Sequence, residues 1–295
     1  MAIVTGGQVT AISNNIIAQA ILYQRRATIM PRLVSNFTLS SGQNQLDLPS
    51  FPATTIQQLT DGQDMAQPQD FTSTAQTFTT NEFGGQVILT DVAMRQAQDD
   101  IKRMAGQDLG MAMAQKIDTQ IQSNFDSFTT NVLGGSSTTV SLRFILAGRA
   151  RIIATTDASA ATKEPAPAAG KISAVLHTFT GLDLQQSIAV AGTANFPEEF
   201  QGTMLDRWWL GRVFGMDIFE GPYLTIASSA AKGAVFHERA LVYVTHKTPT
   251  LEPERDASLR AWELNEVGDF GHGIFKNAWG AEMHFAAGAP TGTTS

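Results

Sequence analysis

One helical pattern in this chain runs much longer than any other. From Met94 to Phe128, apolar residues recur at steps of three and four, as they do on one face of an α-helix. Thr90 and Asp91 come just before it, and either residue can cap a helix N-terminus. The pattern predicts a helix of about 37 residues, or roughly 55 Å, which is about three times the length of an average globular helix. Its apolar face is rich in Ala and Met, so a packing partner can come close and adapt to it.

The segment before this helix, residues 32 to 91, lacks a helical pattern. It contains many strand-forming residues, interrupted by Pro49, Pro52 and the turn signal Asp61-Gly62, and Gly84-Gly85 predicts a bend near its end. It holds few large apolar residues and is unlikely to build a core of its own. We therefore predict a long extended hairpin that leans on another part of this chain or on another chain.

The N-terminal segment predicts an amphipathic helix from Val9 to Arg26, because its apolar residues fall on one stripe at helical spacing. Pro31 ends this helix. Two interpretations stay open at this point. The helix can dock on the core of its own chain, or it can form an arm that docks on a neighbouring molecule.

After the long helix the pattern alternates between helices and strands, which makes the fold class α+β. Residues 157–170 form an Ala- and Pro-rich loop, and residues 286–295 form a small, flexible tail. Two strands around the turn His237-Glu238-Arg239 predict a hairpin. The predicted elements, in order, are helix 140–156, strand 171–177, helix 181–191, helix 198–208, strand 211–219, strands 235–236 and 240–246, alternating strands within 251–274, and strand 278–285.

Composition excludes several classes of protein. Charged residues make up only 16% of the 295 residues, and the net charge is −7. The low charge suits a surface that neighbours cover, and the absence of a basic patch argues against sequence-specific DNA binding. With no cysteines, disulfides, thiolate zinc sites and cysteine nucleophiles are excluded. No signal peptide and no membrane-spanning apolar run is evident, which fits synthesis in the cytoplasm.

We find no motif that carries catalysis. The chain has no Gly-x-Ser-x-Gly, no phosphate-binding glycine loop and no His-Glu-x-x-His. None of its five histidines pairs with another at the helical spacing of zinc ligands, and His237 and His246 lie across the predicted hairpin. The sequence therefore predicts no catalytic residues, no metal site and no cofactor, and the protein is not expected to be an enzyme.

Acidic residues alternate at Glu252, Glu254 and Asp256, so they would share one face of a strand and repel one another if unpaired. An exposed acidic strand is the simplest interpretation, and calcium binding or pairing with arginines of a neighbouring subunit are the alternatives. The residues predicted as candidates for contact between subunits are Phe71, Phe78, Phe83, Arg25, Arg26, Glu252, Glu254 and Asp256.

The order of these elements resembles that of HK97-type major capsid proteins of tailed bacteriophages. The strand FGGQVILTD (Phe83–Asp91) that leads directly into the long helix is similar to the E-loop and spine helix of that family. The segment from Leu142 through the Ala- and Pro-rich loop to the strand KISAVLH (Lys171–His177) is similar to the family's A-domain entry, which is a helix, a loop and then a strand. Thr178 stands where proline is frequent in that family. Two runs near the end, GAVFHERALVYV (Gly233–Val244) and Glu254–Arg260 followed by Val267–Gly271, are similar to its late P-domain.

The resemblance covers about residues 10 to 285. Within the family, the chain resembles most the capsid proteins of short-tailed marine phages. It implies an N-terminal arm at 1–45, an E-loop at 46–90, a P-domain at 91–135 and 236–285, an A-domain at 136–235 and a tail at 286–295. It implies a structural protein of the virion that is assembled in the bacterial cytoplasm. Hexamers and pentamers of this subunit would form an icosahedral head that encloses double-stranded DNA without binding a specific sequence.

The resemblance also implies partners. The arm begins close to Met1, so either scaffolding is expected from a separate protein or the family's scaffolding segment is missing from this sequence. A portal and a decoration protein are the other expected partners. The alternative is an encapsulin-like shell that has the same fold but encloses protein cargo. No motif identifies residues that would match the family's covalent crosslink.

Overall fold

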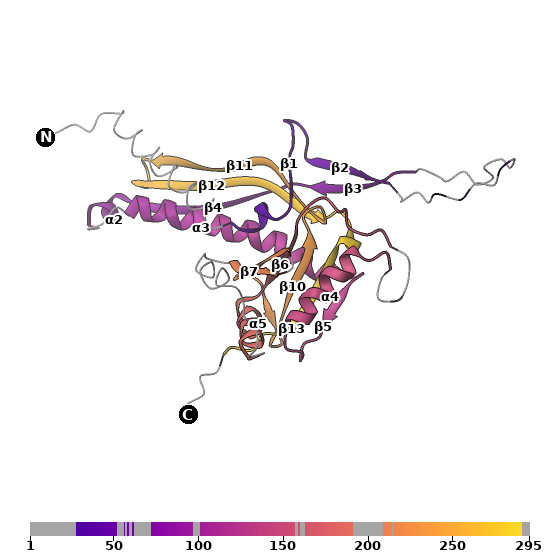
Figure 1. The fold of residues 1–295 in the computed structure, drawn as a ribbon. Coiled ribbons are helices and arrows are strands. Elements are labelled where there is room, and N and C mark those ends of the chain that lie inside the picture. Colours follow the sequence, from indigo (N-terminus) through magenta and orange to yellow (C-terminus); the bar gives the residue numbers. More distant parts are fainter. Residues whose placement is uncertain are drawn as a thin grey trace, which may run out of the picture.

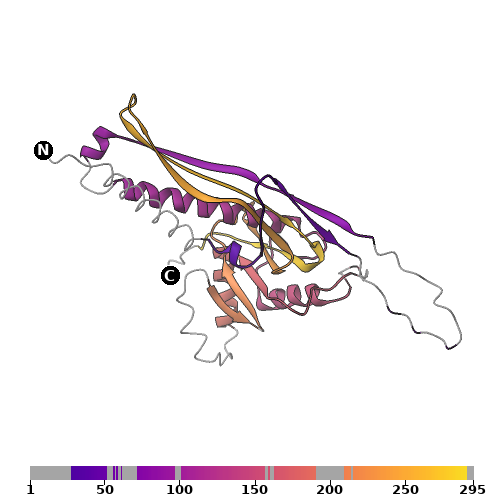
Figure 2. The ribbon, with the colours of Figure 1, turned by 90° about the horizontal axis from the view of Figure 1, so that it is seen from above.

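The computed structural model describes residues 28–51, 72–96, 101–156, 163–190, 209–213 and 215–290, together with residues 56, 58, 61 and 159. Within these residues the chain forms three β-sheets and a set of helices, as Figures 1 and 2 show. The predicted α+β class is confirmed. The predicted helices at 9–26 and 198–208 lie outside the described residues.

The longest described helix is shorter than the helix of about 37 residues that the periodic pattern predicts. The longest, α3, has 22 residues and continues as a 3-10 helix, η2. The described part of the predicted long helix is therefore α3 with α2 before it, and residues 97–100 between them are not described. None of the described helices is long and apolar enough to cross a membrane. Their bounds are η1 Met30–Arg32, α2 Asp91–Gln96, α3 Ile101–Gln122, η2 Ser123–Ser127, α4 Leu142–Ile153, α5 Thr178–Val190 and η3 Asn277–Trp279.

A four-stranded sheet lies along α3, and Figure 2 shows the helix running beside its long strands. The strand order is β1-β11-β12-β4, with β1 parallel to β11 and the other pairs antiparallel. Leu109 of α3 packs against Leu251 and Leu264 of this sheet. The bounds are β1 Ser35–Thr38, β4 Asn81–Thr90, β11 Leu241–Asp256 and β12 Ala261–Ile274.

A seven-stranded sheet forms the second body of the subunit, and α4 packs on its strands β13 and β10. Ile145 and Ile152 of α4 are fully buried against Val235 and Phe285 of these strands. The order is β5-β13-β10-β6-β8-β7, with β9 paired to β10. The bounds are β5 Val132–Gly134, β6 Ile172–Leu176, β7 Trp209–Val213, β8 Met216–Glu220, β9 Ile226–Ala227, β10 Ala230–His237 and β13 Gly280–Ala286.

The third sheet is a hairpin of only two strands, β2 Gln45–Ser50 and β3 Thr74–Thr79. Figures 1 and 2 show it projecting away from the two larger sheets. Of its twelve residues (six in each strand), Phe78 is the buried one. Phe78 packs with Leu39, Val242 and Val244 at the edge of the four-stranded sheet, so the hairpin is anchored at its base.

Two local predictions are wrong. The predicted strand 211–219 is the hairpin β7–β8, because Gly215 adopts a φ of +81° that reverses the chain there. The predicted hairpin around His237 is also wrong, since β10 belongs to the seven-stranded sheet and β11 to the four-stranded one. The chain changes sheets at this turn because Phe236 and Leu241 on either side of it enter the same core.

A buried carboxylate ties the start of the described chain to α3. Asp118 is fully buried and accepts hydrogen bonds from the backbone N–H of Ile29 (3.0 Å to Oδ2) and of Met30 (3.1 Å to Oδ1). Burial raises the pKa of Asp118 to about 6, although the two N–H donors favour its charged form. The contact bridges 88 residues of sequence and fixes where the chain enters η1.

We expect Asp118→Ala to lower the free energy of unfolding of the subunit by about 1–3 kcal/mol, because two buried N–H groups lose their acceptor. Hydrogen exchange at Ile29 and Met30 should accelerate as well. Asp108→Ala is the matched control, since Asp108 lies on the same helix but is exposed. An Asp118→Ala subunit as stable as the wild type, by denaturant titration, would contradict this role.

Candidate assembly surfaces

The described sheets leave several strand edges without a partner. In the four-stranded sheet, β4 is an edge strand, and β2 and β3 pair only with each other. Edge strands present unpaired N–H and C=O groups to any approaching chain. Residues of β4 are mostly exposed, and Ile88 on it is 46% exposed. These edges are therefore available for contact with another molecule.

Large apolar side chains are also exposed on strand β4 and on the two helices that follow it. Val92 of α2 is 52% exposed, and Met104 and Met111 of α3 are 51% and 49% exposed. Together with Ile88 they come from three consecutive elements, β4, α2 and α3. Removing such side chains from water stabilises a contact by about 25 cal/mol for each Å² buried. A neighbour that covers any of them would therefore gain apolar burial.

Three of the predicted contact residues, Phe71, Arg25 and Arg26, lie outside the described residues. Phe78 is 4% exposed and belongs to the core of its own subunit. The ring of Phe83 stacks on that of Phe270, with centroids 4.6 Å apart. Both phenylalanines thus stabilise the fold of their own chain, and contact between subunits at these five positions stays a prediction.

The predicted acidic residues of β11 occupy three different environments. Glu252 forms an exposed ion pair with Lys247 at 2.8 Å. Asp256 accepts hydrogen bonds from the backbone N–H groups of Ser258 and Leu259, which stabilise the turn between β11 and β12 and lower the pKa of this carboxyl. Glu254 is exposed and lies directly opposite Glu263 of β12. Within the described part of the chain, no group of three or more His, Asp or Glu residues is arranged to hold a metal ion.

Four of the five histidines form side-chain hydrogen bonds within the subunit. His272 contacts Gln120 (2.9 Å) and Asn124 (2.8 Å) on the last turn of the α3–η2 region. His177 accepts from the N–H of Phe179, and His246 pairs with Asp269 at 2.8 Å. Burial lowers the pKa of His177 and His272, which favours their neutral forms. These contacts give the histidines a role in the fold.

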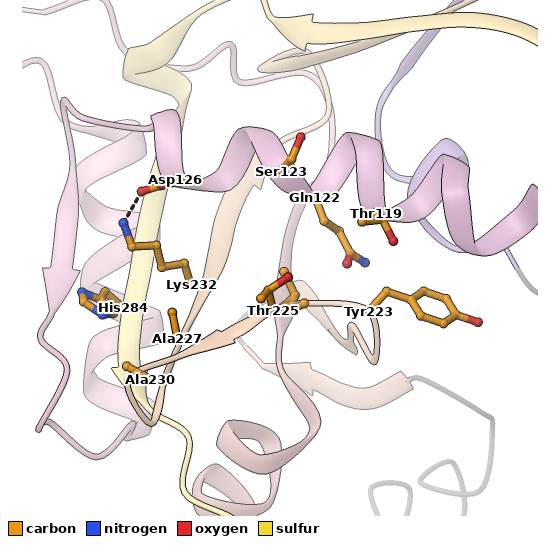
Figure 3. Close-up of a pocket in the computed structure, with 11 residues that line it drawn as sticks. Thr119, Gln122, Ser123, Asp126, Tyr223, Thr225, Ala227, Ala230, Lys232 and His284 are labelled. Atoms are coloured by element: carbon orange, nitrogen blue, oxygen red, sulfur yellow. Dashed lines mark hydrogen bonds and ion pairs between the residues drawn. The ribbon is translucent and has the colours of Figure 1, made fainter. Parts of the chain in front are cut away.

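A pocket of about 490 Å³ opens where the end of α3 meets β9 and β10 (Figure 3). Lys232 at its edge pairs with Asp126 and lies 3.3 Å from Glu282. Gln122 is buried, and neither the nitrogen nor the oxygen of its side-chain amide has a hydrogen-bond partner. Figure 3 shows this amide directed into the pocket from α3. The wall of the pocket therefore carries an amide NH2 group and an amide oxygen, both from Gln122, that are not used in hydrogen bonds within the subunit.

A second, smaller hollow of about 230 Å³ lies between β4 and α3, and we call it the β4–α3 groove. Apolar side chains of α3 and the adjacent glycines Gly84 and Gly85 form its walls, and Glu266 of β12 lies within it. A Cβ atom at Gly84 would come 3.1 Å from the carbonyl oxygen of Glu266, so glycine permits the close approach of the two strands. Its lining residues are Phe83, Gly84, Gly85, Leu109, Ala112, Met113, Lys116 and Glu266.

Glu266 is the unusual residue of this groove. It is 2% exposed, and its Oε2 atom has no hydrogen-bond partner. Burial raises its pKa from 4.5 to about 7. Lys116 lines the same groove, but its Nζ lies over the Phe83 ring, 5.0 Å from the centroid. In the isolated subunit the carboxylate is therefore buried at a cost. The sequence pattern did not identify Glu266. It indicated only a bend at Gly84-Gly85, and Gly85 on β4 lies opposite Glu266.

The pH dependence of subunit stability follows from this burial. The folded subunit binds a proton at Glu266 more tightly than the unfolded chain does, because its pKa is about 7 in place of 4.5. The contribution of Glu266 to stability is therefore fully present below about pH 4.5 and is lost as the pH rises through about 7, by about 3 kcal/mol. Glu266→Gln should remove most of this decline between pH 5 and pH 8, and Asp118 accounts for a smaller part of the same sign.

Denaturant titrations of the unassembled subunit at about pH 5 and about pH 8 provide the measurement. Glu263→Gln is the control, because Glu263 is the neighbouring glutamate of β12 whose carboxylate accepts a hydrogen bond from Gln86 at the surface. Equal pH slopes for the wild type and for Glu266→Gln would show that Glu266 titrates normally.

The fold is found in many solved structures. No protein-family profile matches the chain, and no curated protein sequence matches it. In contrast, 199 chains of solved structures match its coordinates. A structure titled "Mycobacterium phage Che8" has a TM-score of 0.62 and 16% identity, over 88% of this chain and 90% of that chain. The "Capsid structure of the Cyanophage P-SCSP1u" has a TM-score of 0.62 and 14% identity, over 89% of each chain.

A virus-like particle matches as well. The "Crystal structure of virus-like particle from Pyrococcus furiosus" has a TM-score of 0.59 and 9% identity, over 92% of this chain and 98% of that chain. At these identities the likeness shows a shared fold, and it extends over almost the whole of each chain. The HK97-type fold predicted from the sequence is confirmed.

Proposed function

We propose, from the HK97-type fold that this chain shares with phage capsid structures, that it is the major capsid protein of a tailed phage. Copies of it would assemble into the hexamers and pentamers of an icosahedral head around double-stranded DNA. The observation that carries the proposal is the likeness over nearly the full length of both chains, for several separate phages.

The β2–β3 hairpin supports the proposal independently. A two-stranded hairpin is at best marginally stable in water, and this one has Phe78 as its buried residue. Most of its side chains and both of its outer edges face solvent in the single subunit. We infer that it serves as the E-loop and lies across a neighbouring subunit, where its edges and side chains are covered.

The composition of the surface agrees with this role. Only 16% of residues are charged, so neighbouring copies repel one another weakly. Many weak contacts repeated around a shell give stability through multivalency. The acidic chain would contain DNA without gripping its phosphates. No reaction is needed for this function, and we infer that the protein is not an enzyme.

The remaining assignments follow the family pattern. We infer an N-terminal arm at 1–45, an E-loop at 46–90, a P-domain at 91–135 and 236–285, an A-domain at 136–235 and a tail at 286–295. A separate scaffolding protein, a portal and a decoration protein are the inferred partners. Assembly would take place in the cytoplasm of the host, and the finished protein would belong to the virion.

An encapsulin-like shell around protein cargo is the second candidate. The likeness to the Pyrococcus furiosus particle favours it, because 98% of that chain is covered. Structures from several separate phages match over a similar share of this chain, with TM-scores of 0.57 to 0.64. This comparison favours the phage head. The contents of purified shells, nucleic acid or protein, distinguish the two candidates.

The first prediction is that the expressed protein forms large closed shells, alone or together with a scaffolding protein. The measurement is negative-stain or cryo-electron microscopy of the purified material over a range of concentration and salt. Shells should show icosahedral symmetry, since hexamers and pentamers close together in that way. A subunit that stays monomeric under every condition would overturn the proposal.

The second prediction concerns the β2–β3 hairpin. Ser50 and Thr74 are paired in register, so joining them through an Asn-Gly turn removes residues 51–73 and keeps both strands and Phe78. The shortened subunit should unfold at the same denaturant concentration as the wild type. It should assemble poorly, because residues 51–73, the part of the proposed E-loop beyond the hairpin, are removed. A chain without residues 291–295 is the control for loss of residues in general. Normal assembly of the shortened subunit would contradict the assignment of this segment as an E-loop that contacts a neighbouring subunit.

A further inference from the structure

The floor of the β4–α3 groove holds a charge that the subunit does not satisfy. Glu266 is 2% exposed, yet its Oε2 atom has no hydrogen-bond partner. Burial is the cause of its raised pKa, and no described cation offsets it. A buried carboxylate without a partner costs several kcal/mol in effective desolvation, so it is expensive for a chain to keep. Something outside the single subunit can supply the missing donor.

The shape of the groove restricts what that donor can be. Its walls are the apolar side chains of Leu109, Ala112 and Met113 and the bare backbone of Gly84 and Gly85. A volume of about 230 Å³ suits one slender side chain. Lys and Arg place an aliphatic stem against apolar surface and keep the charged group at the end. The groove therefore matches such a side chain in both its apolar walls and its acidic floor.

We propose that the β4–α3 groove receives a Lys or Arg side chain from a second copy of this chain, which pairs with the Glu266 carboxylate. The inference rests on the proposed function and specifies one contact of the assembled shell. Glu266 would be a residue that specifies the contact between subunits.

Charge complementarity on the same chain supports a second copy as the donor. Among the described residues, six exposed cations make no ion pair, namely Arg95, Lys116, Arg143, Lys171, Arg239 and Arg260. Lys116 lines the groove, with its Nζ over the Phe83 ring, and the other five lie outside the groove lining. A contact between two different patches of identical subunits is heterologous, and a heterologous contact with closing rotation generates a ring. Rings are the geometry of hexamers and pentamers.

The test compares Glu266→Gln with the control Glu263→Gln and with the wild type. For each protein, the unfolding of the free subunit is measured at about pH 8, and the lowest concentration that gives shells is measured by light scattering and electron microscopy. Glu266→Gln should leave the free subunit at least as stable as the wild type, because a buried charge is removed. It should raise the assembly concentration roughly ten- to hundredfold, because a charge-assisted hydrogen bond is lost at each contact.

The outcomes separate this inference from the proposed function. Shells formed by Glu266→Gln at the wild-type concentration would overturn the inference and leave the capsid function intact. A Glu266→Gln subunit that is less stable than the wild type would show that the carboxylate stabilises the fold of its own subunit. That result would overturn the inference as well. Glu266→Met, of similar volume, provides the same readouts if the Gln variant is insoluble. A wild-type chain that never assembles would overturn both proposals together.

Discussion

The packing of the end of α3 and of η2 against both large sheets is the contact on which the rest of the structure depends. Phe125 and Phe128 are fully buried there, and the ring of Phe125 lies 5.6 Å from that of Phe236 in the seven-stranded sheet. The same cluster contains Leu241 and Phe270 of the four-stranded sheet. A Cβ atom at position 280 would collide with the Phe128 ring, so Gly280 makes room for it. Because one core joins helix and sheets, the exposed edges and the β4–α3 groove keep fixed positions relative to one another.

Local periodicity in the sequence predicted the elements whose residues contact near neighbours in the chain. Helix α4, strand β6 and helix α5 lie within a few residues of their predicted bounds. Strand 211–219 failed for a local reason, the turn at Gly215, whereas other failures lie where distant segments decide the outcome. Strand β1 pairs with β11, whose residues lie more than 200 positions later, and no local pattern encodes that pairing. The turn after His237 resembled a hairpin because both flanking strands are apolar, whereas the two strands belong to different sheets that share a core.

The candidate site was less predictable than the fold, for a related reason. Glu266 lies in a strand that alternates imperfectly, and a glutamate there is normally exposed. It is buried because α3, more than 140 residues earlier in the chain, covers that face of β12. Asp118 likewise looks like an ordinary helix surface residue until η1 covers it. In the sequence, the acidic pattern at Glu252, Glu254 and Asp256 stood out more clearly, but Glu252 and Asp256 are already satisfied within the subunit.

The unsatisfied carboxylate in the groove bears on how a shell of weak contacts selects the correct arrangement. Apolar contacts stabilise correct and incorrect arrangements by similar amounts, because burial of apolar area has no direction. A buried charge differs, since only an arrangement that delivers a cation removes its cost, and any other leaves it unpaired. If the proposed contact forms, the unpaired Glu266 carboxylate makes the free subunit less stable. Incorrect arrangements of neighbours keep this cost, and the correct arrangement removes it. A low-charge surface that repels other copies weakly needs such a penalty more than a highly charged one does, because long-range repulsion does little there to exclude incorrect pairs.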